Sequence, residues 1–216
     1  MLLRQIIGLE TPDKGYIEVD DIRVTDIYDR SERKNIKPMG MLFQGAALFD
    51  SMDVGLNTSF YLRQHEPSLS ENEVRDRVAN ALKMVGLEGT ERKMPSELSG
   101  GMRKRAALAR LIVYRPQIIM YDEPTTGLDP LTSMQINELI NTTKKELKAT
   151  SIVVTHDIRS ALEVGDRLAF HHEGKIKQIA PKNQFLNIDD PLLHEFFTNA
   201  VIDKQELIRN ESSGSS

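Results

Sequence analysis

The sequence predicts an α/β fold with a mostly parallel sheet and a helical subdomain. Two observations carry this prediction. Short apolar runs at 39–43, 118–121 and 152–155 are separated by helical stretches, and the stretch 45–95 has a helical pattern throughout. Strands that alternate with helices form a parallel sheet covered on both faces. The stretch 45–95 is then expected to be a helical insertion into that α/β domain.

Apolar periodicity and turn residues justify the individual elements in chain order. Residues 2–9 predict the end of a helix that stops near Gly8, and 11–15 is a turn signal before short strands at 16–19 and 22–24. The charged stretch 29–34 predicts a short helix, and the run 39–43 predicts a buried strand that ends at Gln44. Further helices are expected at 54–62, 70–85, 100–113, 131–147, 158–164 and 190–200, and further strands at 118–121, 152–155, 168–170 and 175–179.

The helix expected at 70–85 has the best-defined ends. Ser70 and Glu73 stand at the spacing of a capping box, and Gly86 suits the C-terminal cap. The apolar residues between them fall on one helical face. They are Val74, Val78, Ala81, Leu82 and Val85.

The composition is that of an ordinary globular protein. The chain has 216 residues, 39% of them hydrophobic and 28% charged, and a net charge of −4, which gives no global field for nucleic acid. It has no cysteine, which excludes disulfides, thiolate metal sites and cysteine nucleophiles. No apolar run approaches the length of a membrane span, so we expect any membrane role to be peripheral.

Two adjacent carboxylates, Asp122 and Glu123, follow the apolar run 118–121 directly. In open α/β sheets, ligands lie beyond the carboxyl ends of the strands. One carboxylate there can hold Mg²⁺, and a second can orient an attacking water. Upstream, Ser99, Gly100 and Gly101 open a helix, and helix N-termini bind phosphate. From these residues alone, the alternatives are a solvated surface pair and a plain serine cap.

The order and spacing of these segments resemble the ABC-transporter ATPases. Leu98–Met102 is similar to the family's signature motif, and Ile118–Glu123 to its Walker B motif. The resemblance implies a P-loop NTPase-like fold that uses ATP and Mg²⁺. It implies that Asp122 helps to hold Mg²⁺ and that Glu123 is catalytic, polarising the hydrolytic water. It also implies that Ser99, Gly100 and Gly101 reach nucleotide bound by a second ATPase subunit, so that the active unit is a homodimer.

Three further residues resemble family motifs through their places in the chain. Gln44 resembles the Q-loop glutamine, which contacts Mg²⁺ or water and relays to the membrane subunits. Gly127-Leu128-Asp129 resembles the D-loop, which would place Asp129 among the nucleotide-binding residues; the alternative is a turn leading into the next helix. His156 follows the strand 152–155 and resembles the catalytic switch histidine that touches the γ-phosphate.

A run of basic residues follows the signature motif. It consists of Arg103, Lys104, Arg105 and Arg110. Such a run suits nucleic-acid binding, but it also suits a solvated helix face that complements nucleotide phosphates across the dimer. Because the chain is acidic overall, we favour the solvated face and expect no nucleic-acid partner.

No GxxxxGK[ST] phosphate loop occurs in these 216 residues. In the family, a segment like 1–9 is the helix directly after that loop. We therefore expect the N-terminal strands of the core to be missing and residues 1–216 alone to hydrolyse ATP negligibly. A misassigned start, a fragment and a decayed gene would each explain this.

Two segments resemble one subgroup, the Mla/MCE-type lipid-transport ATPases: Met41–Phe49 with Met52, and Leu98–Arg110. The resemblance implies phospholipid transport at the cytoplasmic face of a bacterial inner membrane, with an ABC permease subunit and an MCE-type substrate-binding protein as partners. The alternatives are an ABC ATPase for another small substrate and a non-catalytic remnant or regulatory subunit. A DNA-repair ATPase would need long coiled-coil arms, and the stretch between Gln44 and Ser99 leaves no room for them.

We expect four segments along the chain. Residues 1–44 are the N-terminal part of the α/β core, and 45–95 are the helical subdomain. Residues 96–187 complete the core with the signature, Walker B and switch-histidine motifs. Residues 188–216 are a C-terminal helix and a disordered tail.

Overall fold

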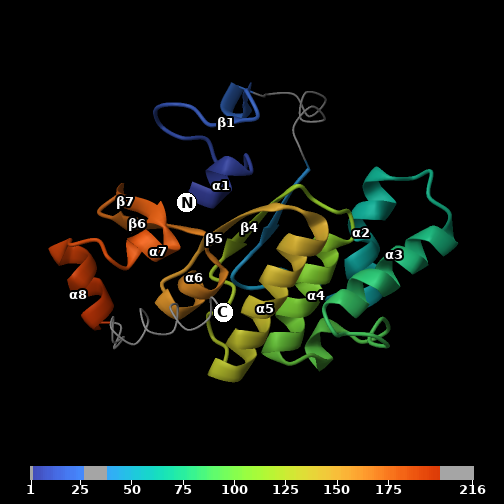
Figure 1. The fold of residues 1–216 in the computed structure, drawn as a ribbon. Helices are drawn as coiled ribbons and strands as arrows, with labels where there is room; N and C mark the ends of the chain where they lie inside the picture. Colours follow the sequence, from blue (N-terminus) through green and yellow to red (C-terminus); the bar gives the residue numbers. More distant parts are fainter. Residues whose placement is uncertain (1, 27–37, 200–216) are drawn as a thin grey trace. The chain divides into compact units, whose positions relative to one another are not determined.

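The computed structural model describes residues 2–26 and 38–199 (Figure 1). The chain divides into two compact units, Met1–Val154 and Thr155–Ser216, here called unit 1 and unit 2. The helix predicted at 29–34 and the tail predicted at 210–216 lie outside the described residues. None of the helices in the described part of the chain is long and apolar enough to cross a bilayer.

Unit 1 is built on a parallel three-stranded sheet with the strand order β3-β4-β5. Its strands are β3 (Met39–Leu42), β4 (Ile118–Asp122) and β5 (Thr150–Val154). Leu42 of β3 pairs with Tyr121 of β4, and Asp122 of β4 pairs with Val154 of β5. The parallel sheet predicted from the three apolar runs is confirmed, with strand ends that differ by one or two residues.

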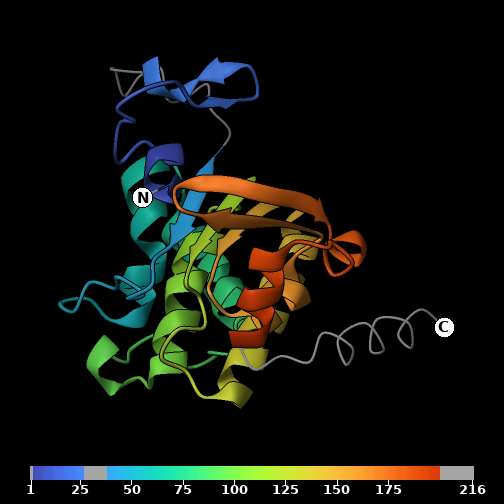
Figure 2. The ribbon, with the colours of Figure 1, turned by 90° about the vertical axis from the view of Figure 1, so that its left-hand side faces the viewer.

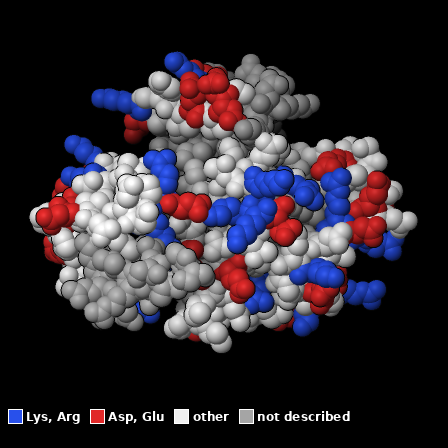
Figure 3. Space-filling view, viewed as in Figure 1, with Lys and Arg blue, Asp and Glu red and all other residues white. Residues whose placement is uncertain are grey.

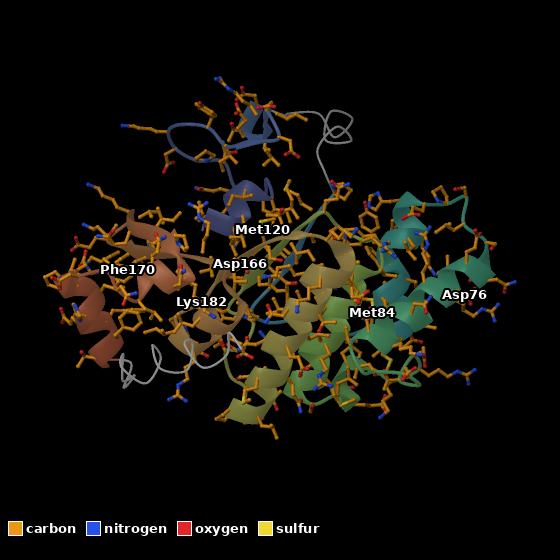
Figure 4. The ribbon with its side chains drawn as sticks, viewed as in Figure 1. Asp76, Met84, Met120, Asp166, Phe170 and Lys182 are labelled. Atoms are coloured by element: carbon orange, nitrogen blue, oxygen red, sulfur yellow. The ribbon has the colours of Figure 1, made fainter. Side chains whose placement is uncertain are left out.

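The central strand β4 is covered on both faces. On one face Met120, labelled in Figure 4, packs with Met41 and with Leu3 of α1 (Leu2–Ile6). On the other face α4 (Gly100–Ile112) lies so close to β3 that a Cβ on Gly40 would come within 2.8 Å of the Leu111 side chain. Three consecutive residues of β4 are 0% exposed: Ile119, Met120 and Tyr121.

Helices connect the parallel strands, as the alternation in the sequence predicts. Four helical segments lie between β3 and β4: α2 (Val54–His65), α3 (Glu71–Met84), the short 3-10 helix η3 (Pro95–Glu97) and α4. α5 (Pro130–Leu147) lies between β4 and β5 and runs beside α4 (Figure 1). The predicted helices at 54–62 and 70–85 are confirmed, and α2 extends one turn further than its apolar pattern.

The capping box predicted for α3 is confirmed. The main-chain N–H of Ser70 donates to the Glu73 carboxylate at 2.8 Å, and the N–H of Glu73 donates to the Ser70 hydroxyl oxygen at 3.3 Å. Each residue thus satisfies a donor that the start of a helix leaves free. The predicted apolar face is buried along its length, from Val74 to Leu82.

One buried amide organises the loop between β3 and α2. The Asn57 side chain is 0% exposed. Its Nδ2 donates to the main-chain oxygens of Phe49, Met52 and Asp53 at 2.8–3.1 Å, and its Oδ1 accepts from the Phe49 N–H at 2.9 Å. Asp53 caps α2 by accepting from the Leu56 N–H at 2.7 Å. These bonds fix residues 49–53 relative to the first turn of α2.

The N-terminal strands are shorter than predicted. β1 (Glu18–Val19) and β2 (Ile22–Arg23) form an antiparallel hairpin, followed by a 3-10 turn η1 (Val24–Asp26). Asp20 and Asp21 at the hairpin turn have φ values of 50° and 63°. Two consecutive left-handed residues form the two-residue hairpin turn whose twist matches that of the paired strands. Aspartate tolerates the left-handed conformation better than most residues.

Unit 2 has its own hairpin and core. β6 (Arg167–His172) and β7 (Lys175–Pro181) are antiparallel and appear as a pair of orange arrows in Figure 2. They are followed by α7 (Lys182–Phe185) and α8 (Pro191–Asn199), and α6 (Ile158–Val164) precedes them. The Lys182 N–H donates to the Asp166 main-chain oxygen at 3.0 Å and so joins the two ends of the hairpin; Phe170 lies in the apolar core (Figure 4).

Candidate functional site

The polar residues predicted to act together lie where β3 and β4 end. Asp122 is the last residue of β4, Glu123 follows it, and Gln44 stands two residues after β3. β3 and β4 are parallel neighbours, so their carboxyl ends lie at the same edge of the sheet. Asp122 and Glu123 are half-buried and Gln44 is exposed. The structure therefore brings these three predicted residues to one edge.

Glu123 is held by its own turn. Its φ of 48° places it in the left-handed region, where a residue with a long side chain is uncommon. Its N–H donates to the Val154 oxygen at 2.9 Å, and the Thr126 hydroxyl donates to its carboxylate at 2.8 Å. A left-handed residue at a site edge persists when its surroundings determine it. Here the surroundings are β5 on one side and the turn 123–126 on the other.

The signature segment Leu98–Met102 begins α4. Ser99 is the N-cap, and its hydroxyl oxygen accepts from the Met102 N–H at 3.3 Å. Ser99 and Gly100 are exposed. A Cβ on Gly101 would lie 2.6 Å from the Thr132 side chain, so this glycine allows α4 to approach α5 closely. The plain serine cap considered from the sequence is thus present, and the exposed start of the helix leaves the phosphate role open as a prediction.

Asp129 begins α5 in the same way. Its carboxylate accepts from the Thr132 N–H at 3.0 Å and from the Thr132 hydroxyl at 2.6 Å. These two bonds lower the pKa of Asp129. A Cβ added to Gly100 would make ordinary van der Waals contact with the side chain of Leu128, the residue before Asp129. The starts of α4 and α5 therefore lie together, and the turn into a helix that was the alternative interpretation of this segment is present.

Lys104 does not lie on the solvated helix face predicted for the basic run. Lys and Arg side chains are common on the surface, interspersed with Asp and Glu (Figure 3), but Lys104 is only 6% exposed. Its ammonium donates to the main-chain oxygen of Gln44 and, at 3.3 Å, to that of Glu123. Burial lowers the pKa of Lys104, and the Asp122 and Glu123 carboxylates act against that shift.

Arg110 corrects the same prediction. Its guanidinium donates to the main-chain oxygens of Ala47 at 2.7 Å and Ala46 at 3.2 Å, and burial lowers its pKa. Both alanines have left-handed φ values, 64° for Ala46 and 51° for Ala47. The basic run is thus only partly a solvated face. Helical spacing could have shown this for Lys104, since it precedes Leu108 by one turn and so lies on the apolar side of α4.

His156 belongs to unit 2 and is described there. It is exposed and lies between Thr155 and Asp157, directly before α6. The Asp157 N–H donates to the Thr155 hydroxyl oxygen at 3.0 Å, and Asp157 caps α6 by accepting from the Arg159 N–H at 3.0 Å. The histidine therefore stands on a short, hydrogen-bonded link between β5 and α6. Its contact with nucleotide stays a prediction.

Comparisons with protein families, individual proteins and solved structures agree on one family. The family model described as ABC transporter matches residues 1–126. A probable ribonucleotide transport ATP-binding protein, mkl, from Mycobacterium leprae (strain TN) is 40% identical over 205 residues, which cover 94% of this chain and 58% of that protein. The chain thus spans little more than half the length of this relative.

Two further matches cover a larger share of the matched protein. The intermembrane phospholipid transport system ATP-binding protein MlaF from Haemophilus influenzae (strain ATCC 51907 / DSM 11121 / KW20 / Rd) is 40% identical over 195 residues, 90% of this chain and 74% of that protein. Among solved structures, the dimeric post-hydrolysis state of the ATP-binding cassette MJ0796 bound to ADP and Pi is 31% identical, with a TM-score of 0.74. That match covers 84% of this chain and 79% of the other.

Proposed function

The chain belongs to the ABC transporter family, and from this premise we propose that it is the ATP-binding and ATP-hydrolysing subunit of a membrane transporter. The observation that carries the proposal is the meeting of Gln44, Asp122 and Glu123 at the carboxyl edge of β3 and β4. That edge is where α/β sheets bind ligands. The strongly similar ATP-binding cassette bound to ADP and Pi supports the same interpretation.

The side chains at this edge suit a bound nucleotide and Mg²⁺. Carboxylate and amide oxygens are the hard ligands that Mg²⁺ prefers, and Mg²⁺ takes only one or two such groups from the protein, with water and phosphate completing its shell. Asp122 and Gln44 would supply them. When bound, Mg²⁺ neutralises charge on the phosphates. Glu123, whose carboxylate already accepts from Thr126, would accept the hydrogen bond of the attacking water and orient it.

We propose the remaining roles by family resemblance. The signature segment Leu98–Met102, in which Ser99 and Gly100 are exposed, would contact nucleotide held by a second copy of the subunit, together with Asp129 at the adjacent start of α5. His156 would contact the γ-phosphate. Packing of Gly100 near Leu128 supports this assignment, because it presents the starts of α4 and α5 as one exposed surface.

The cargo we propose is phospholipid or another hydrophobic compound. Two segments, Met41–Phe49 and Leu98–Arg110, resemble the Mla/MCE-type ATPases, and the MlaF relative supports that choice. The mkl relative carries a different cargo in its name, ribonucleotide, so transport of another small substrate is the second candidate. In the first case the partners would be a permease subunit and an MCE-type protein, at the cytoplasmic face of a bacterial inner membrane.

The test is to tag this chain at its own locus and purify the native complex from membranes. Because residues 1–216 contain no phosphate loop, we expect negligible ATP hydrolysis from these residues alone and Mg²⁺-dependent hydrolysis from the native complex. In the complex, Glu123→Gln should lower that rate at least ~100-fold, because the base that orients water is lost, while the variant still retains ATP. If Glu123→Gln hydrolysed ATP at the wild-type rate, Glu123 would not be the residue that orients the attacking water. A native complex without ATPase activity would favour the regulatory subunit.

The same preparation tests the cargo. Mass spectrometry of the co-purifying subunits should find a permease and an MCE-domain protein. Lipid extraction should find phospholipid in the complex. A solute-binding protein of another class in place of the MCE-domain protein would contradict lipid transport and support the second candidate, without affecting the ATPase assignment.

A further inference from the structure

Three segments of the proposed site meet at Lys104. This residue lies on the second turn of α4, the helix that begins with the signature segment. Its ammonium donates to the main-chain oxygen of Gln44, just after β3, and to that of Glu123, just after β4. A single side chain therefore joins the signature helix to both strand ends that carry the proposed chemistry.

Packing alone does not explain a lysine at this position. A buried ammonium is unfavourable unless it is paired and hydrogen-bonded, and Lys104 is 6% exposed. An unbranched apolar side chain such as methionine would fill similar space without that penalty. What lysine adds is a donor for two main-chain oxygens and a positive charge near the Asp122 and Glu123 carboxylates.

The second cation of α4 makes a useful contrast. Arg110 donates to the oxygens of Ala46 and Ala47, so it holds the loop after β3 from the same helix. Its guanidinium also lies 5.5 Å from the centre of the Phe49 ring, in the same loop. Lys104 thus connects the loop with the Glu123 turn, whereas Arg110 supports the loop alone.

We propose that Lys104 is a positioning residue for ATP hydrolysis, which holds the segments of Gln44 and Glu123 in a fixed relation to the signature helix. The proposal rests on the proposed function, because it needs Glu123 to act on water. Glu123 has a left-handed backbone conformation, and its main-chain oxygen accepts a hydrogen bond from the Lys104 ammonium. A change in that peptide's orientation would move the carboxylate, and small displacements of a reacting group lower rates strongly.

The experiment compares three variants in the native complex. Lys104→Met keeps a long unbranched side chain and removes the donor, whereas Lys104→Arg keeps a donor. The control is Lys83→Met, which removes an exposed lysine from α3. We expect kcat to fall ~10-fold in Lys104→Met with KM for ATP within about twofold, because the loss affects the orientation of water and not phosphate binding. Lys104→Arg should recover at least about half of kcat, and Lys83→Met should match the wild type.

Several outcomes would overturn the proposal. One is a wild-type kcat in Lys104→Met; another is a loss in which kcat and the thermal midpoint fall together and Lys104→Arg recovers neither, which indicates a role in stability only. A rise in KM at constant kcat would likewise contradict positioning. If Lys104→Met does not assemble, Lys104→Gln, which removes the charge but keeps an amide donor, takes its place, and we expect a smaller fall in kcat at an unchanged KM.

A second readout separates this proposal from the proposed function. Amide hydrogen exchange in peptides covering 44–47 and 123–126 should speed up in Lys104→Met and not in Lys83→Met, whether or not ATP is turned over. Arg110→Met should speed exchange in 44–47 only. Unchanged exchange in Lys104→Met contradicts the role of Lys104, whereas absent ATPase activity in the wild-type complex contradicts the proposed function itself.

Discussion

The hydroxyl of Thr126 donates a 2.8 Å hydrogen bond to the carboxylate of Glu123, three residues earlier in the same turn. The Thr126 N–H also donates to the Glu123 main-chain oxygen at 3.3 Å, so the turn is closed by both a main-chain and a side-chain bond. Because Glu123 has few rotamers left once one carboxylate oxygen is bound, Thr126 fixes the direction of the carboxylate as well as the shape of the turn.

We expect Thr126→Val to lower kcat for ATP about tenfold in the native complex, because a hydrogen bond to a charged group is lost at the water-orienting residue. Valine keeps the shape of threonine, so the turn itself should persist. Thr126→Ser keeps the hydroxyl and should stay within about twofold of the wild type. Equal activities in the valine and serine variants would show that this bond does not orient Glu123.

Gly101→Ala should destabilise the chain by about 1–3 kcal/mol, since the new Cβ meets the Thr132 Cγ2 at 2.6 Å. Urea unfolding followed by circular dichroism measures the change. Gly100→Ala is the matched control, because its Cβ would make only ordinary contact with Leu128 at 3.6 Å. Adding Thr132→Ser to Gly101→Ala removes the clashing methyl and should restore part of the loss. No restoration would mean that the close approach of α4 and α5 is not the cause.

Asn57→Ala should lower the free energy of unfolding by about 3 kcal/mol, because it leaves main-chain groups of Phe49 and Met52 without their buried side-chain partner. The exposed Gln64→Ala on the same helix should change stability by no more than about 0.5 kcal/mol. Limited proteolysis should also cut the loop 49–53 faster in Asn57→Ala. An uncut loop in a destabilised variant would separate the amide's role in stability from its role in ordering the loop.

The capping box at Ser70 predicts a pH dependence. The Ser70 hydroxyl and N–H lower the pKa of Glu73. Since the folded pKa lies below the unfolded one, the contribution of Glu73 to stability is present at neutral pH and is lost as the pH falls through the folded pKa. The difference in unfolding free energy between the wild type and Glu73→Gln should therefore shrink towards about pH 3. A difference that stays constant between neutral and acidic pH would show that the Ser70–Glu73 capping box does not form in solution.

Helices could be predicted from the sequence where local signals agreed. The helix at 158–164 has the boundaries that were predicted, and the Ser70 capping box is present as the residue spacing required. Strands at 39–43 and 152–155 were found with slightly shifted ends, since an apolar run shows that a strand is buried and not where its ladder stops.

Contacts between distant segments could not be predicted. The spacing to Leu108 places Lys104 on the apolar side of α4, but only the packing of α4 against two strand ends reveals that it bonds to residues 60 and 19 positions away. The left-handed Ala46 and Ala47 carry no glycine signal, because Arg110 stabilises their oxygens from another helix. The short helix α7 was also missed, since four residues offer no helical period.

The burial of β4 has a consequence for the two carboxylates at its end. Ile119, Met120 and Tyr121 are 0% exposed and lie between two neighbouring strands, so a substitution that changes their volume disturbs layers on both sides at once. A change in volume there needs a matching change in the side chains packed against it, whereas a swap that conserves volume costs less. Asp122 ends that strand and Glu123 follows it without a spacer, so the packing that holds β4 in place also fixes where the two carboxylates stand.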